Sequence, residues 1–433
     1  MLEKVQYKKL SARLLVLGFL MVTMMMASKL TFKSLFIELE DVFGETSDRL
    51  SLAMSTYFII YATVQLILSF IFRKINVKIF LTVSIAFSCI ATALMALSTG
   101  IVYFCIMMGI MGIFQAGIWA GNLYFLNKHL PAYMLPIANT VCTCGVAVAS
   151  TVSHGISALA VAINAWWVAF VICAVIFLIV LFLYVITVNR MEKYPKKVAI
   201  EIDLERNEKN NKQLKSPNEN SCQVNVNSRG RLALYYVIIG AICFIEYFIY
   251  CSVLDWIPDM LKDTYSGLSN SLALVFSMVV PIGVLIGPIL MIMLCEKYSN
   301  YFLIAFVSTA IMLGISIMAV FGYNKGIVVA ITIMLLFALM SRAVGTVFST
   351  IIVTRMKDKI NTAGFAAFTN SLGSIGAALA PVLIGNLKVS FGWTKTYIVI
   401  ALTCLILLIF IGLSLTFSKG ARNLKKLKQE KSV

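Results

Sequence analysis

The sequence predicts an all-α polytopic membrane protein with twelve membrane-spanning helices in two six-helix halves. The first observation is composition, since 60% of the 433 residues are hydrophobic and 13% are charged, whereas a soluble domain is about half apolar and about a quarter charged. The second is a series of twelve apolar windows, and the third is one long polar interruption after the sixth. A chain this apolar has too few polar groups to cover a surface in water. A soluble enzyme, a disulfide scaffold, a disordered chain and a nucleic-acid binder are therefore excluded.

Each window is long enough for a spanning helix, which needs about 20 mostly apolar residues. The first window continues past the length of a signal peptide and lacks a small-residue cleavage site, so we expect an uncleaved anchor. The twelve windows run over residues 14–37, 49–72, 78–98, 101–126, 136–162, 165–188, 232–257, 268–294, 301–321, 327–351, 362–387 and 394–417.

The polar interruption divides the chain into two halves with six windows each. Residues 189–231 are rich in charged side chains and Asn, which is typical of a linker. We therefore expect an N-terminal half over 1–188, a cytoplasmic linker over 189–231, a C-terminal half over 232–417 and a basic cytoplasmic tail over 418–433.

The basic residues predict the orientation. If the N-terminus is cytoplasmic, 28 of the 36 Lys and Arg residues fall in loops and tails on that side, and five fall on the other. The remaining three, Lys29, Lys33 and Arg342, lie within spans. Cytoplasmic loops collect Lys and Arg, so both termini are predicted to be cytoplasmic. The net charge of +17 has the same explanation, so it is not evidence for a nucleic-acid partner.

Two six-helix halves joined by a cytoplasmic linker resemble the major facilitator superfamily, whose halves are parallel repeats. Several motifs are similar to its organophosphate:phosphate antiporter family, the group of the glycerol-3-phosphate and hexose-phosphate antiporters. They are the run from Val253 to Pro258 at the end of span 7, the run from Phe114 to Trp119 in span 4, Thr362 to Phe365 at the start of span 11, and Phe391 to Trp393 before span 12. The resemblance implies the superfamily fold and a transport function.

The phosphate-binding residues of that family are largely replaced. Its members hold phosphate with Arg in spans 1 and 7, Lys in span 2 and His in span 5. The matching positions here are Ser28, Tyr250, Gln65 and about Gly145. Arg forks suit a dianionic phosphate, so the classical sugar-phosphate activity is not expected. The superfamily's acidic loop motif after span 2 is also eroded, because the run Arg73 to Asn76 lacks the Asp.

Three ionisable side chains lie deep in predicted spans: Lys29 in span 1, Glu246 in span 7 and Arg342 in span 10. Such residues are costly in lipid and usually face a cavity or a partner, and the resemblance implies that spans 1, 4, 7 and 10 line the central path. Glu246 precedes Tyr250 by four residues and so shares its helix face. The alternatives are an ion pair of Glu246 and Arg342 that only fixes packing, and a Lys29 that snorkels outward.

Further candidates are polar or aromatic residues, each with a structural alternative. Gln115, Trp119 and Asn122 in span 4 either contact ligand or pack. His154 could relay protons, but a lone histidine in a span more often hydrogen-bonds a neighbouring helix. Asp255 and Trp256 are expected to form an interface anchor or a gate in preference to a binding pair. Arg342 begins a polar stripe with Thr346 and Ser349, and Gly373 and Gly376 predict a close helix contact.

We predict a secondary transporter that moves a small organic anion or zwitterion by alternating access, with Glu246 available for proton coupling. The formal charge of Lys29 and Arg342 against Glu246 is the reason for this substrate class. The alternatives are a transport-fold sensor with a signalling partner and an exporter of amphiphilic compounds. We expect no enzyme activity, no cofactor and no metal, a small-molecule substrate and the lipid bilayer as partners, and a monomer in the cell inner membrane.

Overall fold

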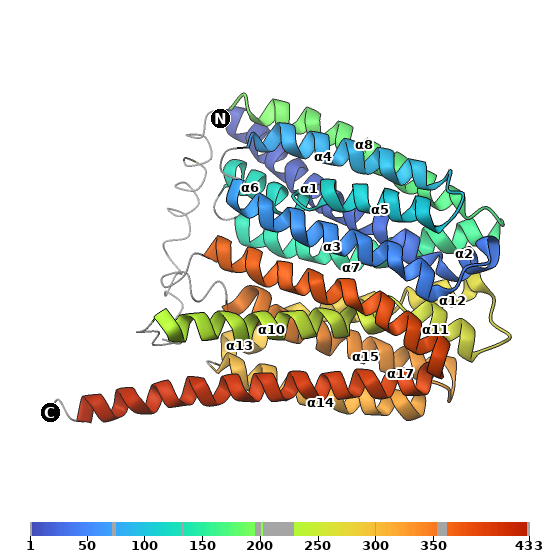
Figure 1. The fold of residues 1–433 in the computed structure, drawn as a ribbon. Coiled ribbons are helices and arrows are strands. Elements are labelled where there is room, and N and C mark those ends of the chain that lie inside the picture. The colour runs from blue at the N-terminus through green and yellow to red at the C-terminus, as the bar shows by residue number, and fades with distance from the viewer. Residues whose placement is uncertain are drawn as a thin grey trace. The chain divides into compact units, whose positions relative to one another are not determined.

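A computed structural model describes residues 2–71, 75–131, 134–194, 201, 229–298, 300–352 and 362–430. Most of the predicted linker 189–231 lies outside these residues, as do Arg73 and Lys74 of the eroded loop motif. The described helices are α1 (Leu2–Ser34), α2 (Phe36–Phe43), α3 (Ser47–Ile71), α4 (Val77–Met95), α5 (Ile101–Gln115), α6 (Ile118–His129), α7 (Leu135–Ala162), α8 (Trp167–Met191), α10 (Arg229–Leu254), α11 (Ile257–Thr264), α12 (Asn270–Ser277), α13 (Pro281–Lys297), α14 (Tyr301–Gly322), α15 (Ile327–Thr346), the π-helix η3 (Val347–Ile351) and α17 (Thr362–Glu430) (Figure 1).

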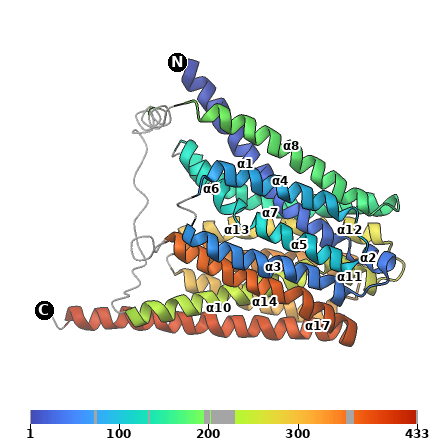
Figure 2. The ribbon, with the colours of Figure 1, turned by 45° about the horizontal axis from the view of Figure 1, so that its top comes forward.

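Eleven continuous segments in the described residues are long and apolar enough to cross a membrane. The last one, Phe368–Leu415, has 48 residues, about twice the length that a single span needs. The backbone of Gly392 adopts φ 75° there, which interrupts α17 and folds its second limb back along the first (Figures 1 and 2). The protein is thus all-α, with the twelve spans expected from the apolar windows.

Several windows hold two helices instead of one. The fourth window breaks between α5 and α6 at Gly117, where a side chain would collide with the ring of Phe80. The eighth breaks between α12 and α13, and Pro281 begins α13 at a position where its missing N–H costs nothing. These breaks leave the number and order of the spans unchanged.

The described chain forms two compact units. Unit 1 consists of Met1–Glu45, Thr63–Glu219 and Asn270–Met278, as far as these are described. In it, α1 packs against α6, α7 and α8, and α4 packs against α8. Its core is formed by fully buried apolar side chains such as Leu14, Met21, Met25, Leu81 and Phe177.

Unit 2 consists of Thr46–Ala62, Asn220–Ser269 and Val279–Val433, as far as described. Its α10 lies along α17, because Gly376 has no side chain where the carbonyl oxygen of Phe244 approaches. The expected small-residue contact of span 11 is therefore present. Its α13 packs on α15 in the same manner, with Gly283 and Gly287 facing the backbone of Leu335 and Leu339. Helices α10 and α15 also contact each other directly.

A candidate substrate and coupling site on α10 and α15

Glu246 of α10 and Arg342 of α15 lie side by side in unit 2. Nη1 of Arg342 is 3.8 Å from Oε1 of Glu246, and the two side chains are 13% and 2% exposed. The two ionisable residues that the sequence places deep in spans 7 and 10 are thus brought together. Each charge offsets part of the cost of burying the other.

The pair is close, but its polar groups are incompletely bonded. A distance of 3.8 Å lies outside the 2.7–3.2 Å of ordinary N–H···O hydrogen bonds. The Ser341 hydroxyl is 3.5 Å from Oε1, and Oε2 of Glu246 has no hydrogen-bond partner among the described residues. A buried oxygen without a partner is costly. Binding a proton, or a ligand that donates a hydrogen bond to Oε2, would therefore stabilise the carboxylate.

Two tyrosines of α10 flank the guanidinium of Arg342. Its Cζ lies 4.8 Å from the ring centroid of Tyr250 and 5.6 Å from that of Tyr247. Both distances are within the range of cation–π attraction. Tyr250 occupies the substrate position implied by the family resemblance, and Tyr247 was not predicted from the sequence.

Two glycines make room for these side chains. An added Cβ on Gly345 of α15 would lie 2.6 Å from Oε1 of Glu246, and one on Gly373 of α17 would lie 2.8 Å from Cδ2 of Tyr247. The absence of side chains at both positions permits the arrangement around Arg342. Sequence reasoning missed Gly345, because nothing local marks a glycine that faces a carboxylate on another helix.

The polar stripe expected after Arg342 is altered by the π-helix η3. The hydroxyl of Thr346 bonds the carbonyl of Arg342 at 2.7 Å, and that of Ser349 bonds the carbonyl of Gly345 at 2.8 Å. Both side chains thus satisfy their own helix. The expected stripe assumed α-helical spacing from Arg342 to Ser349. Ser349 lies in the π-helix, where that spacing does not apply. Single π-turns are frequent at functional sites, and this one begins five residues after Arg342.

The predicted substrate residues other than Glu246, Tyr250 and Arg342 lie in unit 1. The side-chain amide of Gln115 donates to the hydroxyl of Ser28 at 3.0 Å, and that hydroxyl donates to the carbonyl of Met25. The amide of Asn122 donates to the carbonyl of Gly18 at 3.1 Å. Trp119 packs against the core of unit 1. Asn122 and Trp119 therefore have the contacts expected for the packing alternative.

Lys29 is 8% exposed and Gln65 is also 8% exposed, so both are buried in the protein. A snorkelling lysine would carry its ammonium to the surface, and the burial of Lys29 argues against that alternative. Lys33, one turn later, is 3% exposed, and its ammonium lies 3.9 Å from the ring centroid of Phe36. An added Cβ on Gly145 would meet the hydroxyl of Thr23 at 3.0 Å, so α1 crowds any larger residue there.

His154 and Trp256 have structural contacts. Nδ1 of His154 is 2.8 Å from the hydroxyl of Ser34, which links α7 to α1 as the helix–helix alternative requires. Trp256 is 1% exposed and packs against Trp393. This burial is incompatible with an anchor in the lipid interface, because such a ring would be exposed at the rim.

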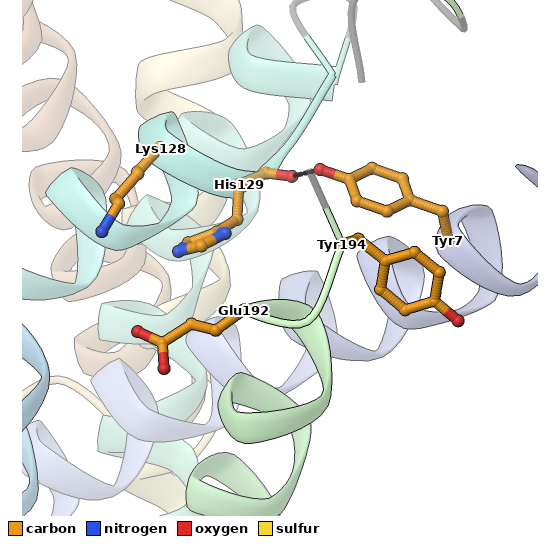
Figure 3. A pocket seen from close by; sticks show the side chains of 5 residues that line it. All are labelled: Tyr7, Lys128, His129, Glu192 and Tyr194. Atoms are coloured by element: carbon orange, nitrogen blue, oxygen red, sulfur yellow. Dashed lines mark hydrogen bonds between the residues drawn. The ribbon is translucent and has the colours of Figure 1, made fainter. Parts of the chain in front are cut away.

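A pocket of about 310 Å³ lies elsewhere in unit 1 and contains none of the predicted site residues. It is lined by Tyr7, Lys128, His129, Glu192 and Tyr194, and Figure 3 shows the hydroxyl of Tyr7 directed at the carbonyl of His129. Glu192 pairs with Lys78 at 2.6 Å. This ion pair joins α8 to the start of α4, next to the loop where the family's acidic residue is missing.

Two solved structures are similar to the chain over nearly their whole length. A crystal structure of the D-xylose-proton symporter matches with a TM-score of 0.70 and 12% identity, over 92% of this chain and 96% of that one. A crystal structure of a mutant of the nucleoside transporter NupG matches with a TM-score of 0.64 and 14% identity, over 93% of this chain and 99% of that one. No curated protein matches in sequence.

At these identities the two structures support the fold alone. The sequence itself matches the family described as Major Facilitator Superfamily over residues 15–381. This match covers most of both halves, including Lys29, Glu246 and Arg342. The chain therefore belongs to the major facilitator superfamily.

Proposed function

We propose that the chain is a secondary transporter that moves a small organic anion, or a zwitterion with a carboxylate, by alternating access. Arg342 holds the anionic group, Tyr250 covers the guanidinium, and Glu246 exchanges the coupling proton. Membership of the superfamily makes the protein a membrane transporter and not an enzyme. The substrate class and the coupling are our proposal.

The observation that carries the proposal is the incompletely bonded pair of Glu246 and Arg342. A purely structural ion pair is expected to close to hydrogen-bond distance and to satisfy both carboxylate oxygens. Here the nearest contact is 3.8 Å, and Oε2 of Glu246 has no hydrogen-bond partner among the described residues. A substrate carboxylate that enters between them would bind the guanidinium bidentately, and Glu246 would then be neutralised by a proton.

Proton coupling has one further support. The D-xylose-proton symporter, by its name, couples a sugar to protons, and this chain shares its fold. The carboxylate of Glu246 is deeply buried within a span. Gain or loss of one proton there changes the net charge of the site. No phosphate ligand is proposed, because Ser28, Gln65 and Tyr250 offer hydroxyl and amide groups where the antiporter family has cations.

The orientation and setting are also proposals. We place both termini and the linker in the cytoplasm, on the strength of the Lys and Arg distribution, and the protein in the cell inner membrane as a monomer. The two halves 1–188 and 232–417 would act as the repeats that alternate in access.

Uptake into proteoliposomes tests the proposal. Labelled mono- and dicarboxylates, amino acids, D-xylose, a nucleoside, inorganic phosphate and glycerol 3-phosphate would be compared with and without an inward proton gradient. We expect uptake of a carboxylate-bearing compound that increases with the gradient, and no exchange of either phosphate. Robust phosphate exchange, or uptake of neutral compounds only, would contradict the assigned role of Arg342.

A matched pair of variants makes the test specific to the site. Arg342→Lys keeps the positive charge and loses the bidentate fork, so we expect a higher KM with the proton dependence retained. Arg190→Lys is the control, because Arg190 is an exposed residue in the last turn of α8, in the other unit. Equal uptake kinetics in the two variants would remove Arg342 from the substrate site.

A further inference from the structure

Helix α3 is divided between the two units. Its residues up to Ala62 belong to unit 2, and its residues from Thr63 onward belong to unit 1. The first part is held on α17, where the hydroxyl of Ser55 donates to the carbonyl of Ala378 and Gly385 makes room for the backbone of Asp48. The contacts that hold the first part of α3 in unit 2 therefore act on a helix whose second part belongs to unit 1.

Lys388 of α17 stands where α3, α11 and α17 meet. Its ammonium is 2.9 Å from the hydroxyl of Ser47, the first residue of α3. It is also 3.2 Å from Asp263 and 3.6 Å from Asp259, both in α11. One cation thus bonds to two other elements from its own helix.

The surroundings of Lys388 shield its contact with Asp259 from solvent. The side chain of Lys388 is 11% exposed and that of Asp259 is 1% exposed, whereas that of Asp263 is 39% exposed. The rings of Trp256 and Trp393 lie with their centroids 5.6 Å and 5.8 Å from the ammonium, and the indole N–H of Trp393 donates to Asp263 at 2.9 Å. Buried ion pairs are screened much less than exposed ones, so salt weakens the contact with Asp259 less than the contact with Asp263.

We propose that Lys388 is a latch, which clamps the first part of α3 onto α11 and α17 and is released during the transport cycle. The proposal rests on the alternating-access cycle proposed above. Release of Lys388 would remove its bonds to the start of α3 and to α11, and rebinding would restore them. Because one ammonium contacts both elements, its loss loosens them together.

The exposure of α3 tests this latch without any knowledge of the substrate. Ser51→Cys, in a chain freed of its native cysteines, serves as the reporter. Ser51 is fully buried, and its hydroxyl bonds the carbonyl of Asp48 in its own helix. A membrane-impermeant maleimide would be added from the side opposite the termini in right-side-out vesicles.

We expect Lys388→Met to increase the labelling rate of the reporter about tenfold, within the range of about 5- to 150-fold for coupled elements. Lys395→Met is the matched control, since Lys395 lies seven residues further along α17, is exposed, and has its ammonium 5.1 Å from the ring centroid of Phe391. That control should label as slowly as the parent chain. A folded Lys388→Met protein with the parent labelling rate would overturn the latch.

Lys388→Met leaves the buried Asp259 without its cation and so carries a risk of misfolding. Lys388→Met combined with Asp259→Asn removes both charges. A folded double variant with fast labelling supports the latch. Slow labelling in the folded double variant, or a failure to fold, assigns the cluster to stability alone. None of these labelling measurements involves transport. A result that contradicts the latch therefore does not contradict the site proposed at Glu246 and Arg342.

Discussion

At the scale of single residues, Glu246 and Arg342 depend on each other's charge. Removing one partner of a buried pair leaves an uncompensated charge and costs about 3–5 kcal/mol, whereas removing both charges is often neutral. This asymmetry separates a pair that fixes packing from a pair that acts on substrate and proton.

Glu246→Gln and Arg342→Gln should each abolish uptake. The double neutral variant should fold, because no lone charge remains, and should stay inactive, because the anion site and the proton acceptor are both gone. The loss in Glu246→Gln concerns gradient-driven uptake, and this variant should still exchange substrate in counterflow, whereas Arg342→Gln should not. Counterflow and gradient-driven uptake, measured in parallel, separate these two effects.

Near-normal gradient-driven uptake by the double variant would show that the pair is structural. Lys29 would then be the remaining buried cation of the predicted set. Thermal melting in detergent of all three variants distinguishes loss of function from loss of folding.

Gly345→Ala should impair uptake although alanine favours a helix. Alanine gains about 1 kcal/mol of helix propensity over glycine, but its Cβ would lie within 3 Å of three atoms of the Glu246 carboxylate group. The carboxylate must move, and the proton coupling should weaken. Gly155→Ala is the control, since its Cβ meets mainly the flexible end of Met278 at 3.2 Å. The two variants would be compared by the proton dependence of uptake.

At the scale of elements, α13 sets the position of α15. Gly283 and Gly287 recur four residues apart on one face of α13, and each faces backbone atoms of α15. Close backbone approach through small residues is the usual means of packing helices in membranes. Because α15 carries Arg342, this packing also positions the site.

Gly287→Ala should therefore lower the melting temperature of the protein in detergent. The added Cβ would collide with the carbonyl of Leu339, and overpacking costs about 1–3 kcal/mol. Gly314→Ala, on α14, meets nothing within 4 Å and should leave the melting temperature unchanged or raise it. An unchanged melting temperature for Gly287→Ala would show that the two helices can separate without cost.

At the scale of the whole molecule, the proposed orientation rests on the distribution of charge. Of the 33 Lys and Arg residues outside the spans, 28 fall on the side of the termini. Asn210 of the linker, which lies outside the described residues, should be cytoplasmic for this reason.

Asn210→Cys, with Cys222 and the other native cysteines replaced, should react with a membrane-impermeant thiol reagent only after the cells are opened. Arg49→Cys, at the start of α3 on the opposite side, is the complementary control and should react in intact cells. The reverse pattern would invert the topology.

The sequence alone determined the fold class, the number of spans and the face shared by Glu246 and Tyr250. Composition, window length and helical spacing are local properties, and they hold whatever the helices pack against. Even the break at Gly392 fell between two windows that the sequence had already separated.

Only the tertiary structure decided which buried groups meet. Glu246 and Arg342 are 96 residues apart, and Ser47 and Lys388 are 341 apart, so no local pattern couples them. Gly345 and Gly373 acquire their roles because other helices bring side chains against them. The π-helix after Arg342 likewise broke a stripe that α-helical spacing predicted. Contacts between helices depend on the packing of the whole unit, and therefore the latch at Lys388 was not visible in the sequence.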